Sequence, residues 1–209
     1  MDFNSYWAGP LVYTILLVIL YINDTVAKQV NTTVQRAFRV MTLWVITFCL
    51  QDVIWGFCDC GYITNPTFFF ASSSIFHIST VITTFCWLYF ILAYLHVKPK
   101  VRNRILFIDG VLLLCQFAII GANFFTPTVF SIVDGKYVTA YLRPLAFFNQ
   151  FIVYLATVVG CLLYMLGILR RQNQEHQESF LPVFVASLAP TILGVLQLLY
   201  PYASYYSLS

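Results

Sequence analysis

Few polar side chains interrupt the long apolar stretches of this sequence, and their types are suited to binding. They include a carboxylate, an imidazole and several carboxamides, which donate and accept hydrogen bonds. An indole lies one turn from the carboxylate and could form an aromatic wall of the same site. The candidate ligand-binding residues are Asp52, Trp55, His77, Gln116, Asn149, Gln150 and Gln197.

The polar candidates fall at one level of the helices expected to carry them. At 1.5 Å per residue they lie roughly 5–10 Å below the outer ends of five different segments. Membrane helices also use such side chains for interhelical hydrogen bonds, which is the alternative role of each one. A level shared by five helices favours a cavity open to the outside, with Asp52 and His77 as its pH-sensitive pair.

The composition requires a bilayer as the solvent of these elements. Hydrophobic residues make up 60% of the 209 residues, charged residues 9%, and the mean hydropathy is +0.81. A soluble domain carries roughly 25% charged residues. The net charge of +3 is too small to indicate nucleic acid as a partner. We therefore expect an all-α membrane protein with a single transmembrane domain over residues 1–209.

Six apolar segments have the length of membrane-spanning helices. They cover about residues 6–22, 40–57, 70–97, 105–122, 145–169 and 180–200. Nine of the eleven Lys and Arg residues fall in the connections between segments one and two, between three and four, and after five. The positive-inside rule places these connections in the cytoplasm and the N-terminus outside. The outer half of the helices carries the polar candidates. In the inner half Asp109 is the only ionisable side chain, and we expect it about one turn from the cytoplasmic end of its helix.

The longest outer connection, about residues 123–144, carries a hairpin signal. Asp134-Gly135 stands between short β-branched and aromatic runs. This dipeptide favours a tight two-residue turn. The sequence predicts a small extracellular β-hairpin with arms at residues 129–133 and 136–140. The tyrosines near the outer helix ends, Tyr137 among them, are typical of an interfacial aromatic belt.

No motif of a soluble enzyme is present. The sequence contains no phosphate-binding glycine loop, no His-x-x-x-His pair and no Gly-x-Ser-x-Gly elbow. The three histidines, His77, His96 and His176, fall at different levels, so we expect no metal site and no cofactor. The chain is expected not to be an enzyme. Gly160, Gly167 and Ala156 would allow close helix packing, either within the bundle or in a homodimer.

Four stretches resemble a known family. They are Gln51-Asp52-Val53-Ile54-Trp55-Gly56; Cys86-Trp87-Leu88-Tyr89 followed by Tyr94; residues 123–127 together with 130–137; and the spacing of Pro190, Gly194 and Gln197. With them the chain resembles the N-terminal seven-transmembrane sensor region of bacterial histidine kinases and diguanylate cyclases of the Firmicutes type. Family members follow their outer Tyr with Arg-Gly, where this chain has Val138-Thr139, and they have a seventh helix and an output domain.

The resemblance implies a receptor domain in the bacterial plasma membrane. A small extracellular ligand would bind in the outer cavity, with the hairpin as a lid, and a cytoplasmic output domain such as a diguanylate cyclase or histidine kinase, in cis or in trans, would read the change. A full-length protein that includes such an output domain would then be an enzyme. Two alternatives remain open: a small-molecule transporter or permease subunit, and a structural membrane protein without a ligand.

Overall fold

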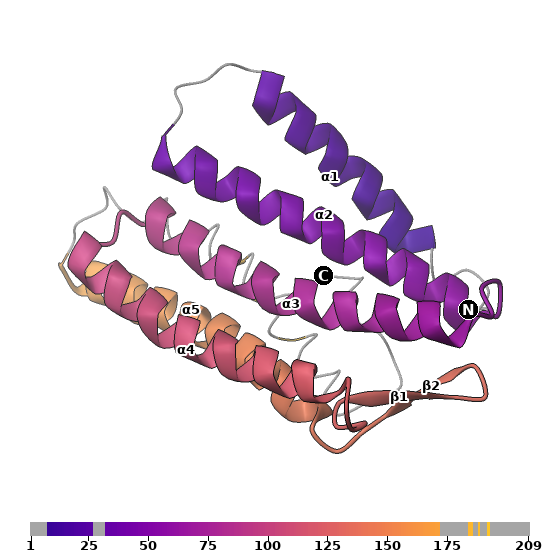
Figure 1. Cartoon of the computed structure of the whole chain (residues 1–209). Coiled ribbons are helices and arrows are strands. Elements are labelled where there is room, and N and C mark those ends of the chain that lie inside the picture. The colour runs from indigo at the N-terminus through magenta and orange to yellow at the C-terminus, as the bar shows by residue number, and fades with distance from the viewer. Residues whose placement is uncertain (1–7, 27–31, 172–183, 186–187, 189–191, 193–209) are drawn as a thin grey trace.

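Five long helices and one hairpin make up the regular structure of the part of the chain that the computed structural model describes (Figure 1). This part comprises residues 8–26, 32–171, 184, 185, 188 and 192. The elements are α1 (Ala8–Val26), α2 (Thr33–Asp59), α3 (Pro66–Tyr94), α4 (Pro99–Ala122), β1 (Phe130–Val133), β2 (Lys136–Thr139) and α5 (Arg143–Arg171). Most of the sixth segment expected at residues 180–200, including Gln197, lies outside the described residues.

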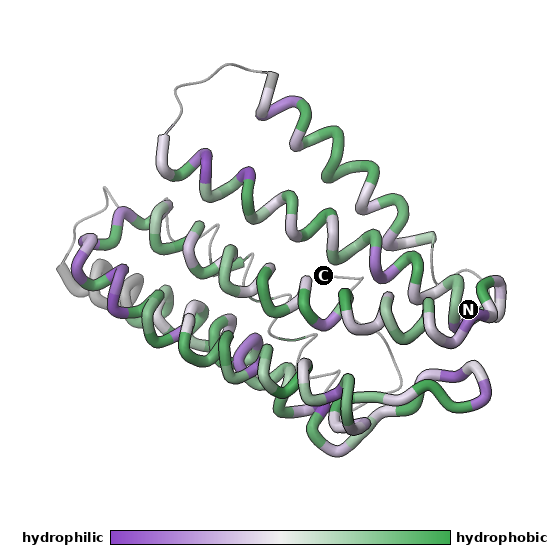
Figure 2. The backbone as a smooth tube through the Cα atoms, viewed as in Figure 1, coloured by the Kyte–Doolittle hydropathy of each residue, from purple (hydrophilic) through white to green (hydrophobic). Residues whose placement is uncertain are grey.

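All five helices are long and apolar enough to cross a membrane. The shortest has 19 residues, which at 1.5 Å per residue is about 28 Å, close to the thickness of the hydrocarbon core. Large apolar side chains point outward along them, among them Leu16, Leu114 and Leu163, each more than half exposed. Figure 2 shows hydrophobic residues along most of each helix and hydrophilic ones mainly toward the ends. This mainly helical, apolar architecture agrees with the expected membrane protein.

Side-chain caps on α2 and α3, and prolines in the first turns of α3 and α4, mark helix starts that precede the apolar runs. The Thr32 hydroxyl accepts a hydrogen bond from the Gln35 amide, and the Gln35 side chain accepts one from the Thr32 amide, each at 3.2 Å. Asn65 caps α3, and Pro66 and Pro99 occupy the first turns of α3 and α4. The helices therefore extend beyond the starts expected at residues 40, 70 and 105, because hydropathy marks the apolar run and not the cap.

The helices alternate in direction, and each packs against a neighbour in sequence. α2 and α3 share the most extensive contact, α1 lies beside α2, and α4 and α5 lie beside α3 (Figure 1). An ion pair joins α1 to α2, since Nε of Arg39 lies 2.6 Å from a carboxylate oxygen of Asp24. Through this alternation Arg36, Lys100 and Arg171 fall at one end of the bundle, called here the basic end, and the hairpin falls at the other.

The two strands form the antiparallel hairpin expected from Asp134-Gly135. Val133 pairs with Lys136, and Ile132 pairs with Tyr137. Asp134 and Gly135 have φ angles of 52° and 73°, which is the left-handed backbone that a type I′ turn requires. The hairpin is confirmed, and its position at one end of the helices places it where it can cover the interior of the bundle.

Candidate functional site

A contact between the hairpin and the middle of α3 is the central feature of the half of the bundle that carries the hairpin, called here the hairpin half. A hydrogen bond of 3.1 Å joins Nε2 of His77 to the hydroxyl of Tyr137. His77 is 3% exposed, so this contact lies inside the protein. The hydroxyl donates or accepts according to which ring nitrogen carries the proton. The strand β2 thus reaches a helix residue 60 positions earlier in the sequence.

Aromatic rings enclose the Tyr137 side chain. Its ring stacks on Phe130, with centroids 5.2 Å apart and an interplanar angle of 14°. The ring centroid of Trp55 lies 5.8 Å from that of Tyr137, with the two planes at 75°, and the Phe69 centroid lies 6.5 Å away. The guanidinium carbon of Arg143 lies 5.8 Å from the Tyr137 centroid, within range of a cation–π interaction. These contacts hold the hairpin against α2, α3 and the first turn of α5.

Burial raises the pKa of Tyr137 to about 12, although the positive charge of Arg143 acts in the opposite direction. The phenol is therefore neutral and able to donate a hydrogen bond at physiological pH. Alternation along the strands explains its position, because Ile132 and Tyr137 form a cross-strand pair on one face of the hairpin. That face packs on the bundle, where Phe130 is fully buried.

Asn123 ties the first strand to the end of α4. Its side-chain oxygen accepts hydrogen bonds from the backbone amides of Val129, at 2.8 Å, and Phe130, at 3.1 Å. Both donors are fully buried, so without Asn123 each amide would lack its partner. A single carboxamide thus fixes the entry of the hairpin into the bundle.

Asp52 is buried on α2 with 1% exposure, one turn before Trp55. The hairpin side chains Tyr137 and Phe130 cover the ring of His77, so the structure has no open surface at this residue of the expected cavity. The partner that the geometry gives to the His77 ring is Tyr137, which sequence analysis assigned to the aromatic belt. The alternation Phe130, Ile132, Tyr137 was the signal that could have identified it.

Small hydroxyl side chains line the buried face of α3, and sequence analysis did not consider them. Several donate to carbonyl groups of their own helix, as Thr84 does to the Thr80 carbonyl at 3.0 Å. Ser72 instead donates to the Gln51 side chain on α2 at 3.2 Å. Small polar residues allow membrane helices to approach closely. The buried hydroxyl residues are Ser72, Ser73, Ser74, Ser79, Thr80 and Thr84.

A second polar group connects α4 to α5. The Asn149 amide nitrogen donates to Asp109 Oδ1 at 3.0 Å and to Gln116 Oε1 at 3.4 Å. Gln116 in turn donates to the Ala146 carbonyl at 2.7 Å. We call Asp109, Gln116 and Asn149 the α4–α5 polar group. Two of the candidate ligand-binding residues, Gln116 and Asn149, are therefore bonded to each other between α4 and α5, which is the alternative interhelical role of such side chains.

The sequence predicted Asp109 one turn from the helix end, but in the structure it lies deeper. α4 begins at Pro99, so Asp109 is ten residues, or about 15 Å, from the start of the helix. It is 4% exposed and bonded to Asn149. Asp109 is therefore a buried group close to the middle of α4, and not a group near water at the helix end. The proline that starts the helix, placed before a basic run, explains the difference.

The predicted site residues thus fall into two groups in space. Trp55 and His77 meet at Tyr137, with Asp52 buried on the same helix as Trp55. Gln116 and Asn149 meet at Asp109. Gln150 is 7% exposed on α5, beside Asn149 in sequence. Among the described residues no cluster of three His, Cys, Asp or Glu side chains could hold a metal ion.

Comparisons with known proteins identify no relative of this chain. No protein-family model matches it, and searches of curated proteins and of solved structures found no match. The geometry of the hairpin and of the buried polar groups is therefore the basis for assigning a function.

Proposed function

We propose that this chain is a membrane-embedded signal-sensing (receptor) domain. A small extracellular ligand would bind beneath the hairpin, against Asp52, Trp55 and His77, and the change would be passed to a cytoplasmic output such as a diguanylate cyclase or histidine kinase. The observation that carries this proposal is the buried hydrogen bond between His77 and Tyr137. It couples a surface hairpin directly to the interior of the helices.

The hairpin has the energetics of a lid. A two-stranded hairpin is marginally stable alone, so its packing on the bundle holds it in place. The hydrogen bond that Tyr137 makes contributes on the order of 1 kcal/mol net. A ligand that replaces Tyr137 at His77, and fills the aromatic space, can therefore shift the hairpin between closed and open positions through its differential affinity for them.

The helices provide a route from the lid to the basic end. His77 and Trp55 lie on α3 and α2, which pack against each other along the bundle. A displacement of α3 at His77 would reach its C-terminal end at Tyr94, next to the connection that carries Lys98. The basic residues at this end favour its location in the cytoplasm, which is where an output domain would read the shift.

A matched pair of histidine variants tests the proposal. The purified protein in lipid nanodiscs is screened by thermal shift against a defined set of amino acids, sugars, nucleosides and dicarboxylic acids. We expect at least one compound to raise Tm for the native chain and for His96→Asn, but not for His77→Asn. His96 is at the basic end and controls for the loss of an imidazole. The proposal is contradicted if no compound raises Tm, or if His77→Asn responds like the native chain.

One observation favours a transporter as the second candidate. The buried polar side chains of α4 extend from Gln116, near the hairpin end, to Asp109, close to the middle of the helix and bonded to Asn149. A transporter needs polar groups along its path. Ligand-dependent flux into proteoliposomes, with the compounds that raise Tm, would favour this candidate, whereas binding without flux would favour the receptor.

A further inference from the structure

A cavity of about 750 Å³ lies between α3, α4 and α5, in the half of the bundle toward the basic end. Its walls are mostly aliphatic, with Leu88, Leu92, Ile105 and Val153 among them. Pockets that bind small molecules commonly have volumes of 300–1,000 Å³. Ile108, at the rim, is 62% exposed, so the cavity is open toward the outer surface of α4. Its site is separate from the hairpin region.

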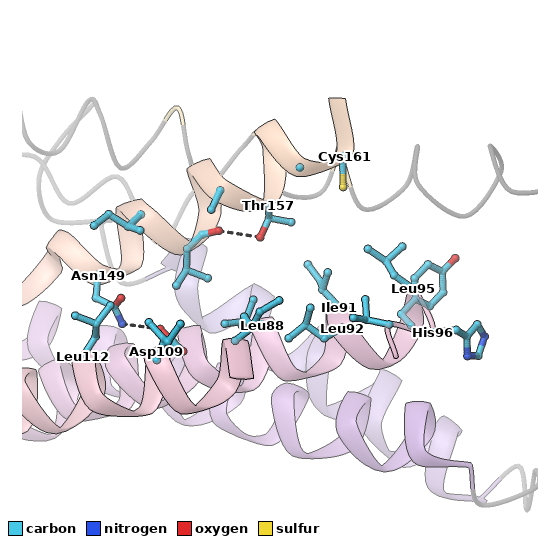
Figure 3. Close-up of a pocket in the computed structure, with 18 residues that line it drawn as sticks. Leu88, Ile91, Leu92, Leu95, His96, Asp109, Leu112, Asn149, Thr157 and Cys161 are labelled. Carbon is cyan, nitrogen blue, oxygen red and sulfur yellow. Dashed lines mark hydrogen bonds between the residues drawn. The ribbon is translucent and has the colours of Figure 1, made fainter. Parts of the chain in front are cut away.

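The polar end of this cavity carries hydrogen-bond acceptors without donors. Figure 3 shows Asp109 and Asn149 together at one end of the cavity and His96 at the other. In the described part of the chain, Asp109 Oδ2 and Asn149 Oδ1 are buried and have no hydrogen-bond partner. Leaving such atoms unmatched costs about 1–3 kcal/mol each.

The bonding within the α4–α5 polar group fixes which atoms remain free. The Gln116 nitrogen donates to the Ala146 carbonyl, so its oxygen is the acceptor that faces Asn149. Asn149 must therefore turn its nitrogen toward Gln116 and Asp109, as observed, and its oxygen away. Both free atoms are acceptors when Asp109 is ionised. A bound molecule would have to donate.

Small residues on α5 leave the space open. Ala156, Thr157 and Gly160 line the cavity, and a Cβ atom added to Gly160 would meet nothing within 4 Å. Residues considered for close helix packing thus form part of a cavity wall. An aliphatic surface of this kind suits an apolar molecule that enters from the bilayer, since apolar burial gives roughly 25 cal/mol per Å².

We propose that this cavity binds a largely apolar small molecule that carries a terminal hydrogen-bond donor, a hydroxyl or an amine. The donor group contacts Asp109 and Asn149, and the apolar body lies along Leu88, Leu92 and Val153. A hydroxyl and an amine share the chemistry of donation, whereas an amine adds a positive charge opposite the carboxylate. The proposal does not depend on the hairpin site.

Photolabelling with three matched probes tests this site. Dodecanol, dodecylamine and the methyl ether of dodecanol each carry the same mid-chain diazirine and are mixed with the protein in nanodiscs. Labelled peptides are identified by mass spectrometry. We expect the alcohol, the amine or both to label residues 88–97 and 152–161 at least about fivefold more than the ether, which has no donor, since a tenfold difference needs only about 1.4 kcal/mol.

Two variants and a control identify the atoms involved. Asp109→Leu removes the acceptor and should reduce alcohol and amine labelling to the level of the ether. Gly160→Leu fills the cavity and should reduce labelling by all three probes, which keeps the test decisive if Asp109→Leu does not fold. Gly110→Leu, a change on α4 that also meets open space and does not line the cavity, should label like the native chain. Equal labelling by the three probes, or undiminished labelling of Gly160→Leu, would overturn the proposal.

Discussion

At the scale of single residues, the Tyr137 side chain determines how the hairpin half is closed. Its hydroxyl bonds His77, its ring stacks on Phe130, and Arg143 lies over it. The aromatic contacts are worth roughly 0.5–1.5 kcal/mol each beyond the area that they bury. The hydroxyl contributes a similar amount, on the order of 1 kcal/mol, and it is the partner of a buried ring nitrogen. The packing of the hairpin on the bundle and the covering of His77 therefore depend on the same side chain.

Tyr137→Phe should destabilise the protein by about 1–3 kcal/mol. The ring packing is retained, but Nε2 of His77 loses its partner at a buried position. Chemical denaturation followed by circular dichroism measures the effect. Tyr141, on the same connection, is 76% exposed, and Tyr141→Phe should change stability by less than about 0.5 kcal/mol. An equal effect of the two variants would show that the His77 contact contributes nothing.

Alkaline pH should loosen the hairpin. The pKa of Tyr137 is about 12 in the folded protein and 10.0 when unperturbed, so the folded state holds the phenolic proton more tightly. The resulting stabilisation is fully present below pH 10 and is lost as the pH rises toward 12. The difference in unfolding free energy between the native chain and Tyr137→Phe, measured from pH 8 to 12, should shrink over this window. A constant difference would contradict the burial of the phenol.

At the scale of elements, local signals predicted more than contacts between elements. Asp134-Gly135 predicted the hairpin because its turn depends on the backbone of two residues. Hydropathy predicted the helices, since each apolar run must be buried in lipid or protein. The predicted position of Asp109 within α4 was wrong because Pro99 starts the helix ahead of the apolar run. Contacts such as Asn149 with Asp109 depend on helix rotation, which no local pattern defines.

The connection between α4 and β1 should be sensitive to one carboxamide. Asn123→Ala removes the acceptor for the amides of Val129 and Phe130, so both strands should become more mobile. Hydrogen exchange of residues 129–139 should accelerate by roughly ten- to a hundredfold, matching a loss of about 1–3 kcal/mol. Asn103 on α4 is exposed, and Asn103→Ala should leave the exchange of the hairpin unchanged. Slow hairpin exchange in Asn123→Ala would mean that the strands hold themselves in place.

At the scale of the whole molecule, the buried polar side chains form two separate groups within one bundle. Near the hairpin, Tyr137 and Phe130 cover His77, and Asp52 and the hydroxyl residues of α3 are buried in the bundle. The α4–α5 polar group borders an aliphatic cavity that extends from it toward the basic end. The sequence predicted one polar level near the outer ends of the helices, with Asp109 as the only ionisable side chain of the inner half. In the structure Gln116 bonds Ala146 and His77 lies against Phe147, which are neighbours on α5. The proposed receptor requires that the polar group near the hairpin opens to the outside and not to the cytoplasm.

The access of water to the buried face of α3 is the most direct measurement of this claim. Ser73 is fully buried and lies one turn before His77 on the same face of α3, so Ser73→Cys places a thiol in the proposed site. The six native cysteines are replaced, and intact cells are treated with a membrane-impermeant methanethiosulfonate reagent.

With the native hairpin, this thiol should react slowly from outside. With Tyr137→Ala added, it should react roughly a hundredfold faster, because losing about 3 kcal/mol of lid packing enlarges the open population by that factor. Equal rates with and without Tyr137, or reaction only when the reagent is supplied from the cytoplasmic side, would contradict the hairpin as the lid of an outward-facing site.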